Sequence, residues 1–177
     1  MGLELLKEAV PNISRVIFLH APEAAPNALK MTQDNASRLG VTLREAKVGA
    51  AEELLSELAA VAEKHPDALF IYPDVVLSSY PRPQQLADFA IKAHLPTINA
   101  FRFFTDAGGL MSYGATTSEI YTSAAEQVAK ILGGTRPSDL PLRQATRFEL
   151  IINLKTAKAL GLTIPRSLLE RADEVIE

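Results

Sequence analysis

The sequence contains no cysteine, so disulfide bonds, thiolate nucleophiles and zinc sites built on cysteine are all excluded. It also has no apolar run long enough to cross a bilayer as a helix. Basic residues are not in excess and form no block, because 18 Lys and Arg stand against 21 Asp and Glu and the formal net charge is -3. A nucleic-acid partner is therefore not expected.

The sequence also lacks the motifs of phosphate-binding and hydrolytic enzymes. It has no Walker loop and no glycine-rich dinucleotide fingerprint, and residues 20–27, which follow the first predicted strand, include no glycine. No nucleophile stands in a motif with an orienting base, and no pair of acidic residues is placed for general acid–base catalysis. These absences predict a protein that is not an enzyme, without catalytic residues, a metal site or a cofactor.

What the sequence does contain is a regular alternation of strand and helix patterns through its first hundred residues. Short β-rich apolar runs predict strands, and amphipathic segments closed by Gly or Pro predict the helices between them. Strands are expected at residues 14–20, 41–48, 68–74 and 96–100, and helices at 3–10, 25–39, 50–64 and 82–94. This order is typical of an α/β fold with a mostly parallel sheet, in which strand 41–48 lies nearer the edge.

The alternation becomes less regular after residue 100. A short helix, a brief strand and a longer helix are followed by a connector with two prolines, and then by a strand and two more helices. We expect these elements at residues 101–107, 110–114, 116–132, 135–146, 147–152, 153 or 154 to 160, and 165 to about 176. The last helix is predicted from Pro165, which is tolerated at a helix start.

Polar and aromatic residues gather where the predicted strands end. Ligands of open parallel sheets bind beyond the carboxyl ends of the strands, which selects the loops at residues 20–27, 72–80 and 99–104. The candidate ligand-binding residues in these loops are His20, Pro22, Asn27, Tyr72, Asp74, Ser78, Phe101 and Arg102.

Five of these candidates have an ordinary structural alternative. His20 donates to a ligand or is a satisfied histidine at a strand end, and Asp74 binds a ligand amine or a metal or caps the following helix. Ser78 supplies a hydroxyl to the cleft or simply forms a turn. Phe101 stacks on a planar ligand while Arg102 pairs with its carboxylate, or the phenylalanines beside Arg102 belong to the core.

Two longer segments resemble a known family. Residues 101–114, FRFFTDAGGLMSYG, are similar to its GFREFVEAGGLMSYG segment, and residues 148–162, FELIINLKTAKALGL, to its FELVINLKTAKALGL segment. Residues 5–12, LLKEAVPN, and the ending from Ile164 to Ile176 agree as well. The family is that of ABC-transporter substrate-binding proteins of the tryptophan/tyrosine type, many of them described only as uncharacterised periplasmic transport components.

The resemblance implies the C-terminal half of such a protein, with a type I periplasmic-binding-protein-like (Rossmann/flavodoxin-like) three-layer α/β/α fold. Residues 1–100 would be the second lobe, and residues 101–177 crossover segments and C-terminal helices packing on that lobe or on a partner. The expected ligand is a small solute such as an amino acid, for some members an aromatic one, and the expected partner is an ABC permease. The family implies the periplasm, although no signal peptide is predicted, and a stand-alone product would be cytoplasmic.

Two departures from the family pattern lie at the expected ligand edge. His20-Ala21-Pro22 replaces a common Asn-Pro pair, and Ala100 replaces a common Gly. A single lobe offers only half of a cleft, so the opposite wall would come from a homodimer partner or from a separate first lobe. The alternative function is an interaction or regulatory module outside transport that reuses the lobe, again possible as a homodimer.

Overall fold

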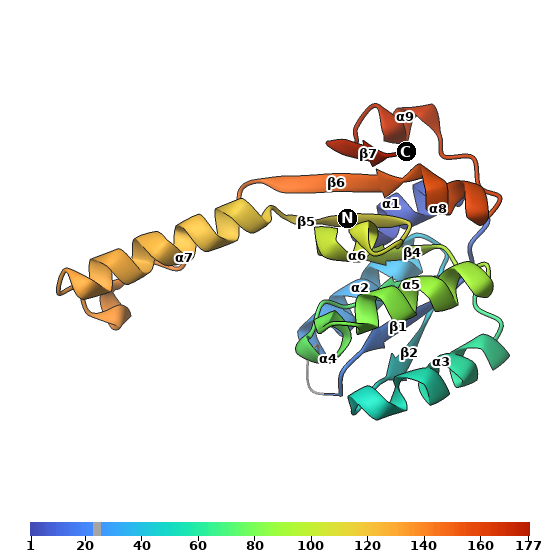
Figure 1. The fold of residues 1–177 in the computed structure, drawn as a ribbon, viewed down its shortest axis with the longest axis horizontal. Coiled ribbons are helices and arrows are strands. Elements are labelled where there is room, and N and C mark those ends of the chain that lie inside the picture. Colours follow the sequence, from blue (N-terminus) through green and yellow to red (C-terminus); the bar gives the residue numbers. More distant parts are fainter. Residues whose placement is uncertain (23–25) are drawn as a thin grey trace.

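The computed structural model describes residues 1–22 and 26–177, and these form one seven-stranded sheet in the order β2-β1-β3-β4-β5-β6-β7 (Figure 1). Neighbouring strands are parallel except β5 and β6, and β2 lies at one edge, so both predictions for the sheet are confirmed. The strands are β1 (Arg15–His20), β2 (Thr42–Lys47), β3 (Ala68–Ile71), β4 (Thr97–Asn99), β5 (Met111–Ala115), β6 (Phe148–Asn153) and β7 (Glu174–Ile176).

Helices cover both faces of the sheet. Successive residues of β1 show this, because Val16 belongs to one buried apolar cluster and Ile17 to the other. The first cluster also draws on α1 (Gly2–Ala9), α2 (Pro26–Arg38), α8 (Leu154–Ala159) and α9 (Arg166–Leu169). The second draws on α3 (Leu54–Glu63), α4 (Val75–Ser78), α5 (Arg82–Lys92) and α6 (Arg102–Asp106). The sheet therefore lies between two layers of helices, which confirms the predicted three-layer α/β/α architecture. Strands buried on both faces in this way are continuous apolar runs.

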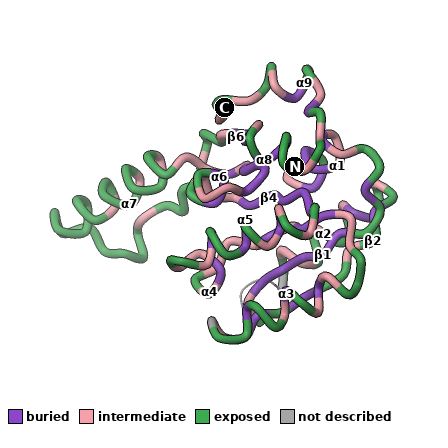
Figure 2. The backbone as a smooth tube through the Cα atoms, turned by 45° about the vertical axis from the view of Figure 1, so that its right-hand side comes forward, coloured by how far each residue is buried: buried purple, intermediate pink, exposed green. Residues whose placement is uncertain are grey.

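We call the sheet and the helices that cover its two faces the body. One long segment projects from it. After β5 the chain forms α7 (Thr117–Leu132), turns through a 3-10 helix at Pro137–Asp139 and returns to β6. We call residues 116–147 the arm, and it projects well away from the layered body (Figure 1). No residue of α7 is buried, and the arm is exposed along nearly its whole length (Figure 2). The arm therefore contributes little to the core.

The helix ends explain two of the three histidines. His65 and His94 follow α3 and α5 with φ angles of 46° and 54°, in the left-handed region that ends helices. Gly40 plays the same part after α2 with φ 65°. These positions close helices, as expected for the two histidines.

Two predictions from sequence were wrong. The predicted helix from Pro165 to Ile176 ends at Leu169, and β7 follows it beside β6. A strand forms here because Asp173 holds the segment against β6. Its backbone N–H donates to the Leu150 carbonyl at 2.9 Å, and its carboxylate accepts the Leu150 N–H at 2.7 Å. The predicted loop at 72–80 contains the short helix α4. The predicted start of a helix at Ala25 lies outside the described residues.

Candidate functional site

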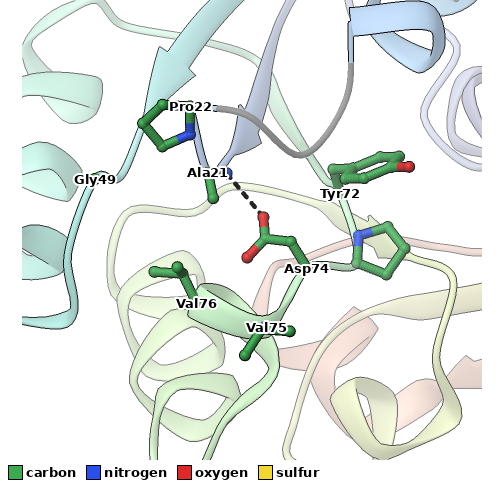
Figure 3. Close-up of a pocket in the computed structure, with 8 residues that line it drawn as sticks. Ala21, Pro22, Gly49, Tyr72, Asp74, Val75 and Val76 are labelled. Atoms are coloured by element: carbon green, nitrogen blue, oxygen red, sulfur yellow. Dashed lines mark hydrogen bonds between the residues drawn. The ribbon is translucent and has the colours of Figure 1, made fainter.

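A pocket of about 650 Å³ opens at the carboxyl ends of β1, β2 and β3, wide to solvent (Figure 3). Each strand end and the start of α4 contribute to its wall. The lining residues are Ala21, Pro22, Gly49, Tyr72, Pro73, Asp74, Val75 and Val76. This is the edge at which a parallel α/β sheet is expected to bind ligands.

Asp74 is the charged group of this pocket, and two hydrogen bonds hold it in place. Its Oδ1 accepts the Leu77 N–H at 2.8 Å, which caps α4, and its Oδ2 accepts the Ala21 N–H at 2.8 Å (Figure 3). The capping interpretation is therefore correct. A carboxylate has about four lone-pair sites, so each oxygen keeps capacity for a further donor. Asp74 is a pre-positioned anion that ties the β1 loop to the β3 loop.

The rest of the wall is mainly apolar. Tyr72 is half-buried and presents its ring beside the pocket, with its centroid 5.7 Å from that of Phe18. Pro22, Pro73 and Val76 add aliphatic surface. Among the described lining residues none carries a positive charge. The wall thus suits a ligand with an apolar or planar part and a cationic or hydrogen-bond-donating group near Asp74.

His20 lies beneath this edge and does not line the pocket. Its side chain is 3% exposed, its Nδ1 lies 2.6 Å from the Ala21 carbonyl oxygen and its Nε2 lies 2.8 Å from Glu45 Oε1. Each ring nitrogen therefore lies within hydrogen-bond distance of an oxygen atom of the same chain. The prediction that His20 contacts the ligand does not fit this geometry, because both ring nitrogens are already used within the chain.

The Glu45 carboxyl is shaped by the same contacts. Burial opposes its ionisation, but hydrogen bonds from Lys47 and His20 outweigh that effect and lower the pKa of Glu45. A charged Glu45 therefore accepts from both side chains, with Lys47 Nζ at 3.1 Å. This cluster at the ends of β1 and β2 supports the backbone that leads into the pocket.

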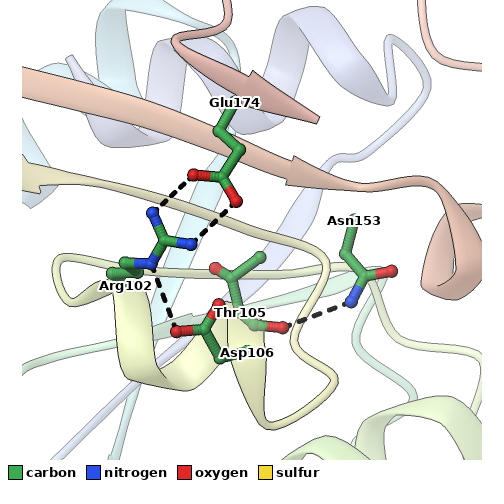
Figure 4. A network of polar contacts seen from close by, with 5 residues as sticks. All are labelled: Arg102, Thr105, Asp106, Asn153 and Glu174. Atoms are coloured by element: carbon green, nitrogen blue, oxygen red, sulfur yellow. Dashed lines mark hydrogen bonds and ion pairs between the residues drawn. The ribbon is translucent and has the colours of Figure 1, made fainter. Parts of the chain in front are cut away.

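Arg102 also binds side chains of the same chain, away from the pocket. Its guanidinium binds both carboxylate oxygens of Glu174, one of them at 2.7 Å, and lies 3.3 Å from Asp106 Oδ2 (Figure 4). The hydrogen bond to Glu174 raises the pKa of Arg102 further and keeps the group charged. The predicted pairing with a carboxylate is real, but the carboxylate belongs to β7 of the same chain, and Arg102 does not line the pocket.

Asn153 completes the polar network on this side of the sheet. Its Nδ2 donates to the Thr105 carbonyl at 3.2 Å and its Oδ1 accepts the Thr156 N–H at 3.1 Å, so it joins α6 to α8 (Figure 4). The Thr105 hydroxyl is buried without a partner among the described residues. The network anchors β6 and β7 to α6.

The remaining predicted residues lie at different places on the same edge. Phe101 is half-buried, stacks on Phe103 at a centroid distance of 5.2 Å and does not line the pocket. Ser78 is the half-buried last residue of α4, and Asn27 is exposed in the first turn of α2. Of the eight predicted residues, the pocket brings together Pro22, Tyr72 and Asp74.

Sequence reasoning missed the contribution of Gly49. This residue follows β2, and its N–H donates to Glu53 Oε2 at 3.1 Å. The strand-end rule that selected the other three loops applies equally to the loop after β2, so the signal was present in the sequence. Val75 and Val76 were missed because α4 was predicted as a loop.

Two further properties concern the described residues as a whole. Within residues 1–22 and 26–177, no group of three His, Asp or Glu side chains is arranged to hold a metal ion. Across the same ranges, every helix is too short or too polar to cross a membrane.

Comparisons with known proteins agree with this architecture. A conserved domain protein from Vibrio cholerae is 30% identical with a TM-score of 0.88, covering 98% of this chain. The ABC domain in complex with L-Trp from Streptococcus pneumonia is 23% identical with a TM-score of 0.88 over 99% of the chain. A ligand-free, open substrate-binding protein with adhesive properties from Clostridium difficile is 23% identical with a TM-score of 0.72. No curated protein sequence matches the chain.

The chain spans between 58% and 59% of the length of these three structures. The fold is periplasmic-binding-protein-like, as the sequence resemblance implied. The family model described as ABC transporter substrate binding protein matches residues 2–176, which is almost the entire chain. The chain therefore belongs to the ABC transporter substrate-binding protein family.

Proposed function

We infer that this chain binds a small organic solute as part of an ABC-type uptake system and does not catalyse a reaction. The observation that carries this inference is the open pocket at the carboxyl edge, where Asp74 is fixed by two hydrogen bonds among apolar side chains. Family membership supports it, and it implies a permease partner and a periplasmic or other extracytoplasmic setting. Pockets of this kind, mostly apolar with a few convergent polar groups, are typical binding sites.

The ligand we propose is an amino acid, with its ammonium group at Asp74 and an apolar or aromatic side chain against Tyr72. Asp74 supplies the negative charge, and the absence of a cation among the described lining residues leaves this wall unsuited to a carboxylate. The Streptococcus pneumonia structure that shares this fold is described as a complex with L-Trp, which supports an aromatic amino acid. The carboxylate of the ligand would then be bound by the opposite wall.

We propose that the opposite wall of the site comes from outside the described part of this chain. The pocket is open to solvent, and the three similar structures are longer than this chain. We propose that residues 1–100 act as the second lobe and residues 101–177 as crossover segments, with a first lobe or a second copy closing the site. Closure between two lobes would exclude water and add contacts that one wall cannot provide.

A ligand screen by thermal unfolding tests the proposal. Amino acids and related amines at about 100 times their dissociation constant should stabilise the protein by about 2.7 kcal/mol, with aromatic amino acids giving the largest shifts. The informative variant is Asp74→Asn, because Asn also caps helices, while the negative charge and the acceptor for the Ala21 N–H are lost; the melting temperature of the variant without ligand shows whether the fold is kept. The matched control is Asp88→Asn on the exposed side of α5.

We expect Asp74→Asn to weaken amine binding at least tenfold while Asp88→Asn leaves it unchanged. Isothermal calorimetry would measure both. Equal binding by Asp74→Asn and the parent protein would contradict the ligand orientation. Absence of binding to every amino acid, with the fold intact, would contradict the solute class.

A further inference from the structure

Ala21 is the first residue after β1, and the peptide unit that joins it to His20 is held on both sides. The Ala21 N–H donates to Asp74 Oδ2 at 2.8 Å, which is the bond drawn in Figure 3. On the other side of the same unit, the His20 carbonyl accepts the Val48 N–H at 3.0 Å. This peptide unit therefore links the end of β2 to the carboxylate in the pocket.

The side chain of His20 holds the next peptide unit. Its Nδ1 lies 2.6 Å from the Ala21 carbonyl oxygen, which can only accept a hydrogen bond, so the proton of this contact belongs to Nδ1. The nitrogen of this unit is that of Pro22 and carries no hydrogen, so the unit can be held only through its carbonyl. The ring thereby fixes the direction in which the chain leaves β1.

The ring is fixed on its other side as well. Its Nε2 lies 2.8 Å from Glu45 Oε1 on β2, and Lys47 Nζ lies 3.1 Å from the same oxygen. The His20 side chain is 3% exposed, and its ring centroid lies 5.4 Å from that of Phe18. A buried ring with a contact at each nitrogen keeps one orientation, so a change at Glu45 is passed on to the backbone of Ala21.

We propose that His20 is a positioning residue for the ligand-binding carboxylate of Asp74, acting through Ala21, and that Glu45 sets the orientation of the His20 ring. The proposal rests on the proposed function, because it takes Asp74 as the group that binds the ammonium of the ligand. The Leu77 N–H holds Oδ1 from within α4, whereas the Ala21 N–H holds Oδ2 from a different strand. One bond alone would let the carboxylate turn about its side-chain bonds, and the second bond removes that freedom.

A carboxylate that is fixed in advance favours binding, because less conformational freedom is lost when the ammonium arrives. His20 is not among the residues that line the pocket, so it acts on the ligand only through other groups. Its replacement should therefore weaken amine binding less than the loss of the Asp74 charge does.

Two substitutions at position 20 separate the two contacts of the ring. The amide nitrogen of Asn stands as many bonds from Cα as Nδ1 of His, and the amide nitrogen of Gln as many as Nε2. His20→Asn can therefore still donate to the Ala21 carbonyl, whereas His20→Gln reaches toward Glu45 instead. Calorimetry with L-tryptophan should show an affinity loss of about fivefold for His20→Gln and of less than about twofold for His20→Asn. Equal losses in the two variants would overturn the role of the Nδ1 contact.

Glu45→Gln tests the second contact without altering the buried ring. It should weaken L-tryptophan binding by about twofold to threefold, because the ring loses its charged partner. The matched control is Glu63→Gln at the exposed end of α3, which removes the same charge and should leave the affinity unchanged. Glu45 lies on the edge strand β2, so this variant still tests the proposal if the buried histidine cannot be replaced. Equal affinities of these two variants would contradict the role of Glu45.

Amide hydrogen exchange without ligand separates positioning from a general loss of stability. Ala21 and Leu77 both donate to Asp74, but the His20 ring contacts the backbone of Ala21 alone of the two. In His20→Gln the Ala21 amide should exchange about tenfold faster, while the Leu77 amide keeps its rate. Faster exchange at both amides would give His20 a merely structural role and would overturn the proposal.

A double-mutant cycle tests whether His20 acts through Asp74. In an Asp74→Asn background, His20→Gln should change the affinity for L-tryptophan by less than about twofold, because the carboxylate that it positions is gone. An undiminished loss in that background would overturn the proposal, and so would an unchanged Ala21 exchange rate in both His20→Gln and Glu45→Gln. If the Ala21 rate changes as expected but the parent protein does not bind L-tryptophan, the proposed ligand is contradicted while the link from His20 to Asp74 is supported.

Discussion

Helix α5 of the body and helix α7 of the arm have similar amphipathic sequences, yet they are buried very differently. On α5 the residues Pro83, Leu86, Ala87 and Ala90 are buried against the sheet. On α7, which is longer by five residues, no residue is buried. Periodicity therefore fixes which face of a helix is apolar but not what covers that face. In the body the cover is the sheet, whereas no residue of α7 is buried by the described part of the chain.

The largest contrast between the two regions should appear when a central side chain of the body is removed. Phe18 in β1 is fully buried and stacks on Phe70 at a centroid distance of 5.3 Å. Phe18→Ala should lower the free energy of unfolding by about 3–5 kcal/mol, since it deletes a large buried ring and leaves a cavity. Urea denaturation followed by circular dichroism would measure it. A loss below about 1 kcal/mol would mean that the body is loosely packed.

The junction between body and arm should be the next most sensitive place. Gly114 of β5 lies against the backbone of Ala100, and a Cβ built there would be 2.0 Å from the Ala100 carbonyl oxygen. Gly114→Ala must therefore displace main chain, and we expect a loss of about 2–3 kcal/mol in the free energy of unfolding. The control is Gly133→Ala at the end of α7, where the nearest atoms are 3.4 Å away. Equal melting temperatures for the two variants would contradict the close approach.

An electrostatic tie within the body should have a smaller, pH-dependent effect. Asp67 accepts hydrogen bonds from the Arg15 guanidinium and from the Ser14 and Arg15 N–H groups at 2.8 Å. Led by the bond from the Arg15 side chain, they hold the pKa of Asp67 well below its usual value of about 3.9. Asp67→Asn should cost about 1–2 kcal/mol at neutral pH, because four donors, including the Ser14 hydroxyl at 2.9 Å, lose a charged acceptor.

The sign of the pH dependence follows from the lowered pKa. The stabilisation by ionised Asp67 is complete above its unfolded pKa and is lost as the pH falls through the folded pKa. The difference in unfolding free energy between the parent protein and Asp67→Asn should therefore stay constant above about pH 5 and shrink below about pH 4. Denaturation curves across this range would measure it. A difference that grows on acidification would show that Asp67 is not the stabilising anion.

The sequence predicted most helices and strands of the body and the arm better than the end of the chain and the site, for reasons visible in particular residues. Strand β1 is a short run of β-rich apolar residues, which is typical of a strand covered on both faces. The helix predicted to Ile176 was wrong after Leu169, because β7 depends on the contacts of Asp173 with Leu150, 23 positions away. At the site, Tyr72 and Asp74 followed from the strand-end rule. The partners of His20 and Arg102 lie 25 and 72 positions away, at Glu45 and Glu174, so local sequence could not reveal them.

The smallest effect of a substitution is expected on the exposed face of the arm. Leu132 is 83% exposed on α7, and Leu132→Ala should change the free energy of unfolding by less than about 0.5 kcal/mol when the protein is dilute. The same substitution in the body, Leu69→Ala, removes a fully buried side chain and should cost about 2–5 kcal/mol. A cost of Leu132→Ala as large as that of Leu69→Ala would contradict the exposure of α7. Thermal melts of the two variants would therefore separate an apolar residue that the chain covers from one that it leaves exposed.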